Sequence, residues 1–416
     1  MLSLKSFASI VVLVTYAATA TPGCKQGVPL PPVPRSDAPG PKRPGPKADD
    51  GAQEPFFPMK QDGKYGYMKQ TGEVVIQPAF DSAFPFQEGM AKVRVGELWG
   101  FIDSQGQLLV KPKYLRVADF SDGLAAVVML DDYLGPGSGP GVGLRGAIRV
   151  GFIGKTGKYV IEPKYLGDVY SNSFADGRAS VRVRSTNRYG YLDEHGEFAI
   201  EPVFSRADKF SDGLALVWRD GKPAYIDASG KVVIEVDRFI AFRPFSEGLA
   251  GVLAEVMKDG KTVRRWGYIN RKGELVVSPR YKSVGKFSEG LAVVKTGFND
   301  PRYVPEGEEY EPAKWGYIDK HGKVVIELQY SKALAFSEGL ALVRKDGLYG
   351  YINLEGKMVI QPQFEHASGF QGGLARIRSD PGWQRNTAPL TAGRRRVWGK
   401  IGYINKSGEY VREPTK

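Results

Sequence analysis

Short apolar runs separated by glycine-containing turns recur from Phe56 to the end of the chain. KWGYIDKHGKVVIELQY (residues 314–330) and RWGYINRKGELVVSPRY (residues 265–281) have almost the same order of residues. Segments such as GYID and VVIEP are short and rich in aromatic and β-branched residues. Runs of this length and composition, bounded by turn residues, predict β-strands.

One template accounts for these runs: aromatic-Gly-aromatic-Ile-Asp, two variable residues, Gly, three apolar-rich residues, any residue and Pro. It occurs nine times, and the shortest spacing is that from Gly66 to Gly100. Its central residue is Gly66, Gly100, Gly151, Gly190, Ala224, Gly267, Gly316, Gly350 and Gly402 in turn. A repeat of this kind predicts one array instead of two or three unrelated domains.

A second landmark, Gly-Leu-Ala or a close variant, follows the central residue at a nearly fixed distance, as from Gly100 to Gly123 and from Gly316 to Gly339. The distance from this landmark to the next central residue varies much more. It is shortest from Gly339 to Gly350 and longest from Gly373 to Gly402. Insertions therefore collect at one connection, as expected when loops project from one side of a stacked array.

The turn and strand residues of a copy each have a structural reading. Asp-x-x-Gly, as in Asp103 to Gly106, predicts a type I turn whose carboxylate accepts a hydrogen bond from the backbone two residues on. The Pro that follows the second apolar run, such as Pro112, is expected to end strand pairing. GLAVV predicts a third strand, and a tight hairpin, as in KDGLYGYI, leads into the next copy.

These elements predict an all-β fold whose unit is a three-stranded antiparallel meander. One such meander is too small to be stable alone, so its aromatic faces must pack on neighbouring units. We expect a tandem array of about nine meanders in a β-solenoid or superhelical arrangement. The alternative is a β-propeller-like closure, although propellers usually have four to eight blades of four strands each.

The N-terminus has the layout of a secretory signal: Lys5, an apolar run from Phe7 to Ala20, and small residues. The run is too short to span a bilayer comfortably. Two exits compete. Ala18-Thr19-Ala20 suits ordinary cleavage, whereas Gly23-Cys24 resembles the end of a bacterial lipobox, in which Cys24 would be lipidated.

Residues 1–23 are therefore predicted to be a signal peptide, residues 24–55 a Pro-rich linker and residues 56–416 the repeat array. The Pro, Gly, Lys and Asp of the linker predict an extended spacer. We expect an exported protein, either lipid-anchored at the bacterial cell envelope or periplasmic or secreted. Lipid chains would hold it at a membrane surface without crossing the bilayer.

WGYID, the following G-x-V-V-I-x-P and F-S-x-G-L-A-x-V resemble the WG-repeat family of bacterial proteins. The resemblance covers residues 56–416 and implies a repetitive β protein, often exported, that serves as a binding or scaffolding module. It implies no shared catalytic residues. Val150, Pro223 and Ile401 replace the first aromatic residue of the template, so we expect looser packing in those copies.

No catalytic residue, metal site or cofactor is predicted. One Cys excludes an intramolecular disulfide, and no G-x-S-x-G elbow or P-loop occurs. His195 and His321 fall in turns and His366 in a linker, without a third ligand for zinc. The acidic pairs Glu308-Glu309 and Asp131-Asp132 lie in insertions. If the protein were a glycoside hydrolase, such pairs would supply its two carboxylates.

The longest insertion, from Arg378 to Lys400, carries the candidate binding residues. They are Trp383, Arg394, Arg395 and Arg396. An Arg cluster beside an aromatic residue suits a phosphate, a carboxylate or a protein hot spot, but a solvated loop has the same composition. The recurring aromatic residues are expected to pack between units rather than to form a carbohydrate-stacking stripe.

We therefore expect an exported, non-enzymatic binding or scaffold protein. Its partner would be a protein or an anionic envelope polymer, in keeping with the net charge of +12. Nucleic acid is disfavoured, because export removes the protein from it. The alternative functions are a cell-envelope hydrolase with a site formed between the insertions, and a purely structural spacer.

Overall fold

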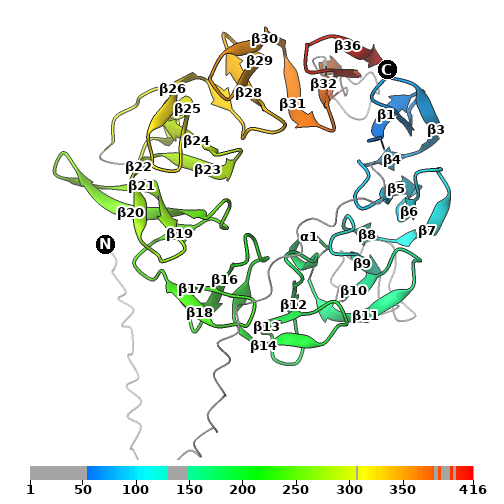
Figure 1. Ribbon diagram of the computed structural model, residues 1–416, viewed down its shortest axis with the longest axis horizontal. Coiled ribbons are helices and arrows are strands. Elements are labelled where there is room, and N and C mark those ends of the chain that lie inside the picture. The colour runs from blue at the N-terminus through cyan, green and yellow to red at the C-terminus, as the bar shows by residue number, and fades with distance from the viewer. Residues whose placement is uncertain are drawn as a thin grey trace, which may run out of the picture. The chain divides into compact units, whose positions relative to one another are not determined.

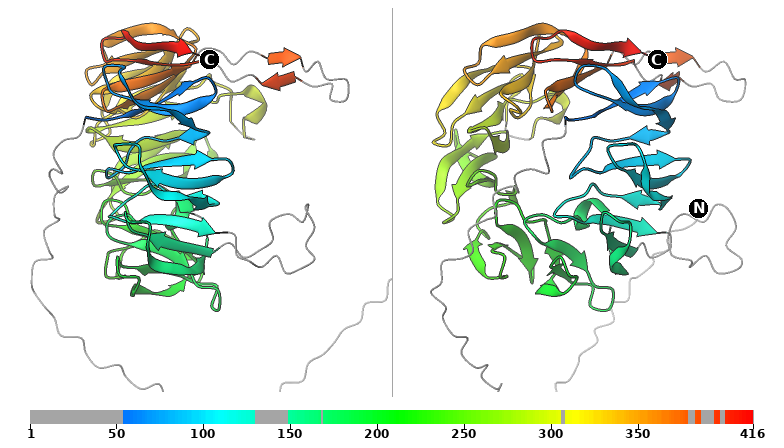
Figure 2. Two further views of the ribbon diagram at one scale, coloured as in Figure 1. Left: turned by 90° about the vertical axis from the view of Figure 1, so that its right-hand side faces the viewer. Right: turned by 45° about the vertical axis from the view of Figure 1, so that its right-hand side comes forward.

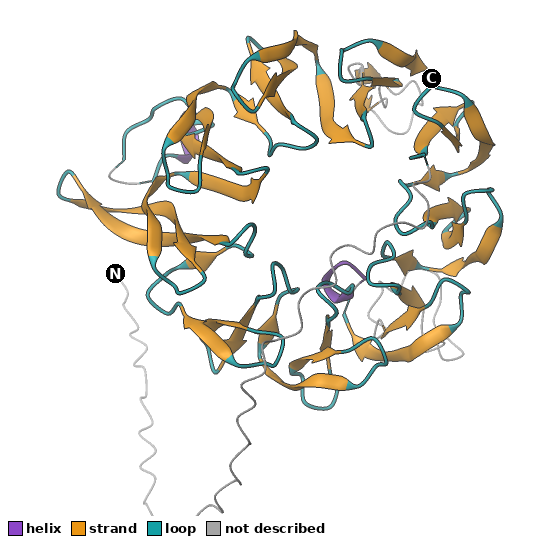
Figure 3. Ribbon diagram, in the orientation of Figure 1, coloured by secondary structure: helices purple, strands orange, loops and turns teal. Residues whose placement is uncertain are grey.

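The computed structural model describes residues 54–129, 149–167, 169–305, 308–378, 383–385, 394–396 and 400–415. The compact unit is Gln53–Lys416. The expected signal peptide and almost all of the expected linker, including Cys24, lie outside the described residues. Strands dominate, and the helical segments among the described residues are α1 (Val169–Asn172) and η1 (Pro301–Tyr303) (Figure 3). The expectation of an all-β repeat fold is confirmed.

Small antiparallel sheets follow one another around a ring (Figure 1). Most contain four strands that pair in chain order. We call these the inner strand, the second strand (which begins near Gly-Leu-Ala), the third strand (which holds the central glycine) and the outer strand. The seven-stranded sheet consists of one such set of four strands and a set of three that lacks the inner strand, and the two sets are joined by the single pair Leu166–Arg182.

The strand bounds follow this division. The inner strands are β4 (Ser82–Ala83), β8 (Arg116–Val117), β15 (Arg206–Ala207), β19 (Ala241–Phe242), β23 (Ser283–Ser288), β27 (Lys332–Ala333) and β31 (His366–Gln371). The second strands are β1 (Phe57–Gln61), β5 (Ala91–Val95), β9 (Ala125–Met129), β12 (Ala179–Arg182), β16 (Ala215–Arg219), β20 (Leu249–Lys258), β24 (Leu291–Thr296), β28 (Leu340–Lys345) and β32 (Leu374–Arg378). The third strands are β2 (Lys64–Met68), β6 (Leu98–Ile102), β10 (Arg149–Ile153), β13 (Tyr189–Leu192), β17 (Lys222–Ile226), β21 (Lys261–Asn270), β25 (Lys314–Ile318), β29 (Leu348–Asn353) and β35 (Ile401–Ile404). The outer strands are β3 (Val74–Phe80), β7 (Leu108–Tyr114), β11 (Tyr159–Leu166), β14 (Phe198–Phe204), β18 (Val232–Glu235), β22 (Leu275–Tyr281), β26 (Val324–Tyr330), β30 (Met358–Phe364) and β36 (Tyr410–Thr415).

The inner strand is the element that the sequence pattern did not predict. In β4 only two residues pair, Ser82 with Arg94 and Ala83 with Val93. Five of the seven inner strands have only two residues, as β4 has, and β23 and β31 have six. A strand of two residues is too short to show the alternation of apolar and polar positions from which strands are inferred. Most sheets therefore have four strands where three were expected.

The predicted Asp-x-x-Gly turn is confirmed. The Gly106 amide donates to the Asp103 carbonyl at 3.0 Å, which closes the turn. The Asp103 carboxylate accepts the Gln105 amide at 3.0 Å and the Gln107 amide at 2.8 Å. Gly106 has a φ of 80°, a conformation that glycine adopts at little cost.

The prediction that the template proline ends strand pairing is wrong. Strand β7 runs through Pro112, with Phe101 paired to Val110 and Trp99 paired to Tyr114 beyond a bulge. The bulge brings the outer strand against the central glycine: a Cβ on Gly100 would lie 2.8 Å from the Pro112 nitrogen. The central glycine is therefore required by this close approach of two backbones.

The copy with Ala224 shows the same relation in reverse. Its outer strand has Val236, where seven other copies have Pro and the copy with Gly316 has Leu328, and Ala224 pairs directly with Glu235. Without the bulge that covers the central position elsewhere, there is room for a Cβ.

Neighbouring sheets pack through the second aromatic residue of the template, as the sequence predicted. Tyr351, for example, is fully buried, and its ring centroid lies 4.8 Å from that of Phe370 in the next sheet. Eight such pairs have centroid distances of 4.8 to 5.2 Å in tilted or edge-on geometry: Tyr67–Phe86, Phe101–Phe120, Phe152–Phe174, Tyr191–Phe210, Tyr225–Phe245, Tyr268–Phe287, Tyr317–Phe336 and Tyr351–Phe370. They join each sheet to the next.

Where the second aromatic residue is Tyr, its hydroxyl also reaches the next sheet. Tyr67 donates to the Phe84 carbonyl at 2.8 Å, 17 residues further along the chain. The same spacing recurs for Tyr191–Asp208, Tyr268–Gly285, Tyr317–Leu334 and Tyr351–Ser368, and the spacing is 18 residues for Tyr225–Arg243. A buried hydroxyl thus obtains a partner and ties two sheets together.

Acidic residues at the tip between the inner and second strands make a further link. The Gly248 amide donates to the Asp212 carboxylate of the preceding sheet at 2.7 Å. Equivalent bonds join Glu88 to Gly123, Asp122 to Gly177, Asp176 to Gly213, Glu247 to Gly290, Glu289 to Gly339 and Glu338 to Gly373. Each acidic residue has a positive φ, as tight two-residue turns require.

The last sheet packs on the first, and we call this contact the seam (Figure 1). The Tyr403 hydroxyl donates to the Pro58 carbonyl at 2.5 Å, and its ring lies 6.1 Å from that of Phe57. A buried cluster contains Met59, Met68 and Leu374 from both sides. An open solenoid is therefore not confirmed, and these contacts favour the propeller-like alternative, although no single described sheet closes into a barrel.

Strands run across the thickness of the ring (Figure 2). In every sheet the connection from the second to the third strand leaves at the same end, which we call the hairpin face. The opposite end, with the Asp-x-x-Gly turns, is the turn face. Most of the length variation lies at the hairpin face, from the Asp346-Gly347 turn to the insertion at 297–313, as the sequence predicted. One copy also has the extra segment with α1 between its outer strand and the next second strand. None of the described helices is long and apolar enough to cross a membrane.

Candidate functional site

The structure describes only part of the predicted binding insertion. Strands β33 (Trp383–Arg385) and β34 (Arg394–Arg396) pair with each other, with Trp383 opposite Arg396 and Gln384 opposite Arg395. The backbone thus brings the predicted aromatic residue and the Arg cluster together at the hairpin face. The rest of this insertion, 379–382, 386–393 and 397–399, lies outside the described residues.

A second feature of the hairpin face was missed by the sequence reasoning. The first aromatic residue of the template is half-buried at this end of the sheets, and a cation lies over its ring in most copies. In the sheet with Trp315, the Lys295 ammonium lies 5.5 Å from the ring centre and comes from the directly paired residue. The pairs are Lys60–Tyr65, Arg94–Trp99, Arg182–Tyr189, Arg206–Trp218, Arg243–Trp266, Lys295–Trp315 and Arg344–Tyr349. We call these seven pairs the cation–aromatic ring.

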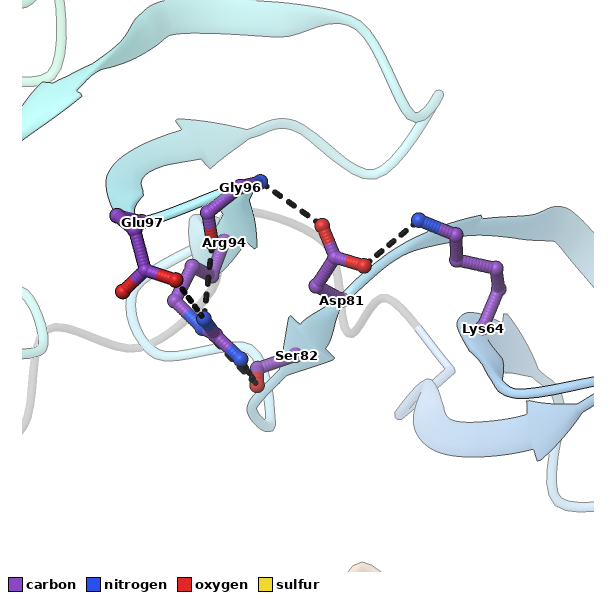
Figure 4. Close-up of polar contacts among 6 residues, drawn as sticks. All are labelled: Lys64, Asp81, Ser82, Arg94, Gly96 and Glu97. Carbon is purple, nitrogen blue, oxygen red and sulfur yellow. Dashed lines mark hydrogen bonds and ion pairs between the residues drawn. The ribbon is translucent and has the colours of Figure 1, made fainter.

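Several of these cations, among them Arg94, Arg206 and Arg344, are held in place by neighbouring polar groups. Arg94 donates to the Gly96 carbonyl at 2.8 Å and to the Ser82 hydroxyl at 3.3 Å (Figure 4). Asp81, between the first two sheets, accepts from Lys64 at 2.6 Å and from the Gly96 amide at 2.8 Å. The hydrogen bond from Lys64 holds the pKa of Asp81 below its usual value. The aromatic face and the charge beside it are therefore presented in a defined geometry.

The copy with Pro223 keeps its aromatic residue by another route. Trp218 stands directly opposite Pro223 on the paired strand, and the Arg206 guanidinium lies 4.3 Å from its ring centre. Trp218 also packs against Phe242 of the next sheet at 6.3 Å. The cross-strand neighbour thus replaces the missing template residue. The sequence signal was there, a Trp shortly before Pro223, but only pairing shows that the two share a place.

An acidic side chain in the insertion at 297–313 is committed to an ion-pair cluster. Glu308 accepts two hydrogen bonds from Arg265, at 2.6 and 3.2 Å, and pairs with Lys282. The side chains of Arg265, Glu308 and Lys282 are 8%, 10% and 14% exposed. Burial opposes the charge of Glu308, but these hydrogen bonds outweigh it and lower its pKa. Glu308 therefore anchors the insertion and is not placed to act as a general acid.

The histidines show no convergence in the structure. His195 and His321 lie in Asp-x-x-Gly turns, where their backbone amides donate to Asp193 and Asp319. His366 begins β31 instead of lying in a linker. In the part of the chain that the structure describes, no three His, Cys, Asp or Glu side chains are placed to hold a metal ion.

Solved structures with a similar fold include a eukaryotic initiation factor, with a TM-score of 0.56 at 12% identity, covering 86% of this chain and 95% of that chain. This likeness concerns the fold alone. An acylaminoacyl peptidase from Pyrococcus horikoshii has a TM-score of 0.35 at 11% identity, covering 73% of this chain and 46% of that chain. No curated protein matches the sequence.

The family described as the WG containing repeat matches the sequence eight times, over most of the ring. The matched ranges are 65–99, 99–133, 151–185, 189–222, 224–261, 266–297, 315–349 and 349–383. Each includes a central residue that the repeat pattern identified, from Gly66 to Gly350. The chain belongs to the WG containing repeat family.

Proposed function

We propose that the chain is an exported, non-enzymatic repeat protein that binds an anionic partner, an acidic protein or an envelope polymer, through its hairpin face. The observation that carries this proposal is the cation–aromatic ring. It places a positive charge beside a half-buried aromatic ring in sheet after sheet.

The chemistry of these pairs favours an extended anionic partner. A cation over an aromatic face keeps most of its charge available to an anion, and the exposed ring edge offers apolar contact. Each pair alone binds weakly, but sites repeated on one frame act together on a polymer or a broad protein surface. The excess of 58 Lys and Arg over 46 Asp and Glu adds long-range attraction.

The finer architecture belongs to the same proposal. We infer nine copies, of which the ninth, around Gly402, lies beyond the eight family matches and supplies Tyr403 to the seam. In this arrangement the hairpin face is a continuous annulus rather than one edge of an open solenoid, so all the pairs face the same side.

The test is a charge-removal series on the hairpin face. Arg182→Gln, Lys295→Gln and Arg344→Gln are combined in one chain. Binding to poly-glutamate, and to a polymer with a phosphate backbone, is measured against salt concentration. We expect at least tenfold weaker binding and a shallower salt dependence, because three of the seven cations are removed.

The matched control removes the same charge from the turn face. Lys158, Lys231 and Lys272 are exposed residues in or beside the turns of the turn face, and their triple change to Gln lowers the net charge equally. If the turn-face variant binds the polymers as weakly as the hairpin-face variant does, polymer binding depends on net charge alone. The hairpin face is then not the binding surface.

Two further proposals concern residues outside the described core of the ring. Changing Arg394, Arg395 and Arg396 to Ala should weaken binding to the same polymers if this insertion extends the hairpin-face surface. Lipidation of Cys24 is tested by Cys24→Ser followed by cell fractionation. Unchanged membrane association would leave cleavage after Ala20 as the better account of export.

A further inference from the structure

A cavity of about 1010 Å³ lies at the seam. Its walls are the inner segments of the second and last sheets, together with β1 of the first sheet. Aromatic side chains line several parts of this wall, among them Phe57, Tyr65, Phe84, Phe86 and Tyr403. Phe84 is 42% exposed, so part of this aromatic wall is open to solvent.

The corresponding place in the second sheet is filled by the chain itself. After β4, the Phe84 amide donates to the Lys92 carbonyl of the second strand at 3.2 Å, and the Phe84 carbonyl accepts the Tyr67 hydroxyl. Phe86 then packs against Tyr67 at 5.0 Å. Seven sheets have such an inner strand, and in the set β12–β14 the helix α1 precedes the second strand instead.

Within the described residues, the first sheet has no strand on the inner edge of β1. Met59 pairs with Gly66 as Val93 pairs with Gly100, so Met59 of the first sheet corresponds to Val93 of the second. By this alignment Pro58 takes the place of Lys92. Its carbonyl, which would accept the amide of an inner strand, accepts the Tyr403 hydroxyl instead.

Two links between neighbouring sheets are also altered at the seam. The ring centroids of Phe57 and Tyr403 are 6.1 Å apart, against at most 5.2 Å in the other eight contacts. Gly372 stands where the other tips have an acidic residue, and Pro55 stands where the next sheet has the glycine amide. The seam therefore has neither the carboxylate nor the N–H of the usual link.

The sequence just before the ring does not contain the aromatic residues of an inner segment. When the same alignment is continued towards the N-terminus, Asp50 corresponds to Phe84 and Ala52 to Phe86. Phe57 packs on Tyr403 in the role that Phe86 has against Tyr67. No aromatic side chain of the chain corresponds to Phe84 at this position, because the aligned residue is Asp50.

We infer that the seam cavity binds an extended peptide of a partner protein, which carries an aromatic side chain beside Tyr65, into the place equivalent to that of Phe84 beside Trp99. The peptide lies along β1 as an added inner strand. One peptide N–H donates to the Pro58 carbonyl in place of the Tyr403 hydroxyl. That hydroxyl then donates to a peptide carbonyl, as the Tyr67 hydroxyl donates to the Phe84 carbonyl. This site is separate from the cation–aromatic ring and takes a neutral, apolar segment.

The test uses the full chain and a peptide probe copied from the second sheet, acetylated SAFPFQE (residues 82–88), with SAAPAQE as the control peptide. Fluorescence anisotropy should show saturable binding of the first peptide. The control should bind at least tenfold more weakly, because burial of one Phe side chain accounts for about that factor. Equal binding of the two peptides would overturn the inference.

A blocking variant locates the site on the protein. Gly369 lines the cavity, its φ is not in the left-handed region, and a Cβ there would meet no atom within 4 Å. Gly369→Leu should therefore fold normally and reduce peptide binding at least tenfold. Gly154→Leu, in a distant turn where a Cβ would make only an ordinary 3.6 Å contact, is the matched control. Loss of binding in both variants, or in neither, contradicts the proposed site.

Other occupants are distinguished by two comparisons. If a chain that begins at Gln53 binds the probe but the full chain does not, the residues before Gln53 fill the cavity and an outside partner is excluded. A dimer of the free chain that the peptide dissociates would assign the site to a second copy. Because the hairpin-face variant leaves the cavity intact, it should bind the peptide normally, so the two proposals can fail independently.

Discussion

At the scale of single residues, the most demanding position of the repeat is the central glycine. In the copy with Gly350, a Cβ would lie 2.5 Å from the Ile360 carbonyl oxygen and 2.8 Å from the Pro362 nitrogen. Both atoms belong to the backbone of the neighbouring strand and cannot rotate away. The template therefore has glycine for steric reasons. The close approach does not depend on the proline, because a Cβ on Gly316 would lie 2.8 Å from the nitrogen of Leu328, which replaces the proline in that copy.

Gly350→Ala is expected to lower the free energy of unfolding by about 1–3 kcal/mol, because overpacking displaces the paired strand. Thermal and urea unfolding measure the effect. Gly369→Ala is the control, since a Cβ there meets no atom, and it should be neutral or slightly stabilising. A Gly350→Ala chain as stable as the parent would show that the bulge relaxes without cost.

At the scale of elements, the ion-pair cluster decides how the insertion at 297–313 is held. Glu308 lies between Arg265 on β21 and Lys282, which precedes β23. The Lys282 ammonium also lies 3.9 Å from the ring centre of Phe298. A buried carboxylate between two cations is costly to disrupt, because its removal leaves two buried charges without compensation.

Glu308→Gln should cost about 3 kcal/mol or more in stability at neutral pH. The exposed neighbour Glu309 provides the matched control, and Glu309→Gln should cost less than about 0.5 kcal/mol. Hydrogen exchange of the insertion should rise in the first variant only. Equal protection in both variants would mean that other contacts hold the insertion.

The same residue predicts an acid dependence. Because the pKa of Glu308 is lowered in the folded state, its contribution to stability is present above the pKa of the unfolded chain, about 4.3. It is lost as the pH falls through the lower folded value. The parent should therefore lose more stability than Glu308→Gln on acidification, as measured by thermal unfolding across this range.

At the scale of the whole molecule, stability depends on contacts between sheets, and buried tyrosines make many of them. Burial raises the pKa of Tyr67, Tyr191, Tyr225, Tyr268, Tyr317 and Tyr351, and raises that of Tyr403 to about 12. These hydroxyls join successive sheets around the ring, so their titration affects the entire array.

Alkaline unfolding should therefore be cooperative. A raised folded pKa means that the stabilising contribution is complete below the unfolded value of about 10 and is lost as the pH rises towards the folded value. Circular dichroism and tyrosinate absorbance should change together above that unfolded value. Ionisation of all tyrosines near it, while the strands persist, would contradict the burial of these hydroxyls.

Removal of residues 400–416 tests the seam. The deletion takes away β35, β36 and Tyr403, and it exposes the apolar cluster around Met59 and Leu374. We expect a lower melting temperature and binding of a hydrophobic dye, with strand content otherwise retained. If the melting temperature is unchanged, the seam contributes little and the array behaves as an open one.

The sequence predicted an element only where its residue pattern extends over enough positions. Template strands such as Val324–Tyr330 and turns such as Asp103 to Gly106 carry enough residues to be predicted, and both were confirmed. The two-residue inner strands carry too few. The proline was misread because a bulge between paired strands is a relation between two segments, which neither segment reveals alone. The cation–aromatic pairs were missed for the same reason: Arg94 and Trp99 are unremarkable until pairing sets them side by side.

The sequence by itself determined the repeat, the residues of its turns and the positions of its aromatic residues. These features depend on local backbone preferences and on the period of apolar residues, which neighbouring positions in the chain define. Ring closure followed only from the tertiary structure. Tyr403 and Pro58 are 345 residues apart in the chain, and whether they meet depends on the small rotation between successive sheets, summed around the array. No single copy encodes that sum, so the seam and its cavity were decided by the assembled fold.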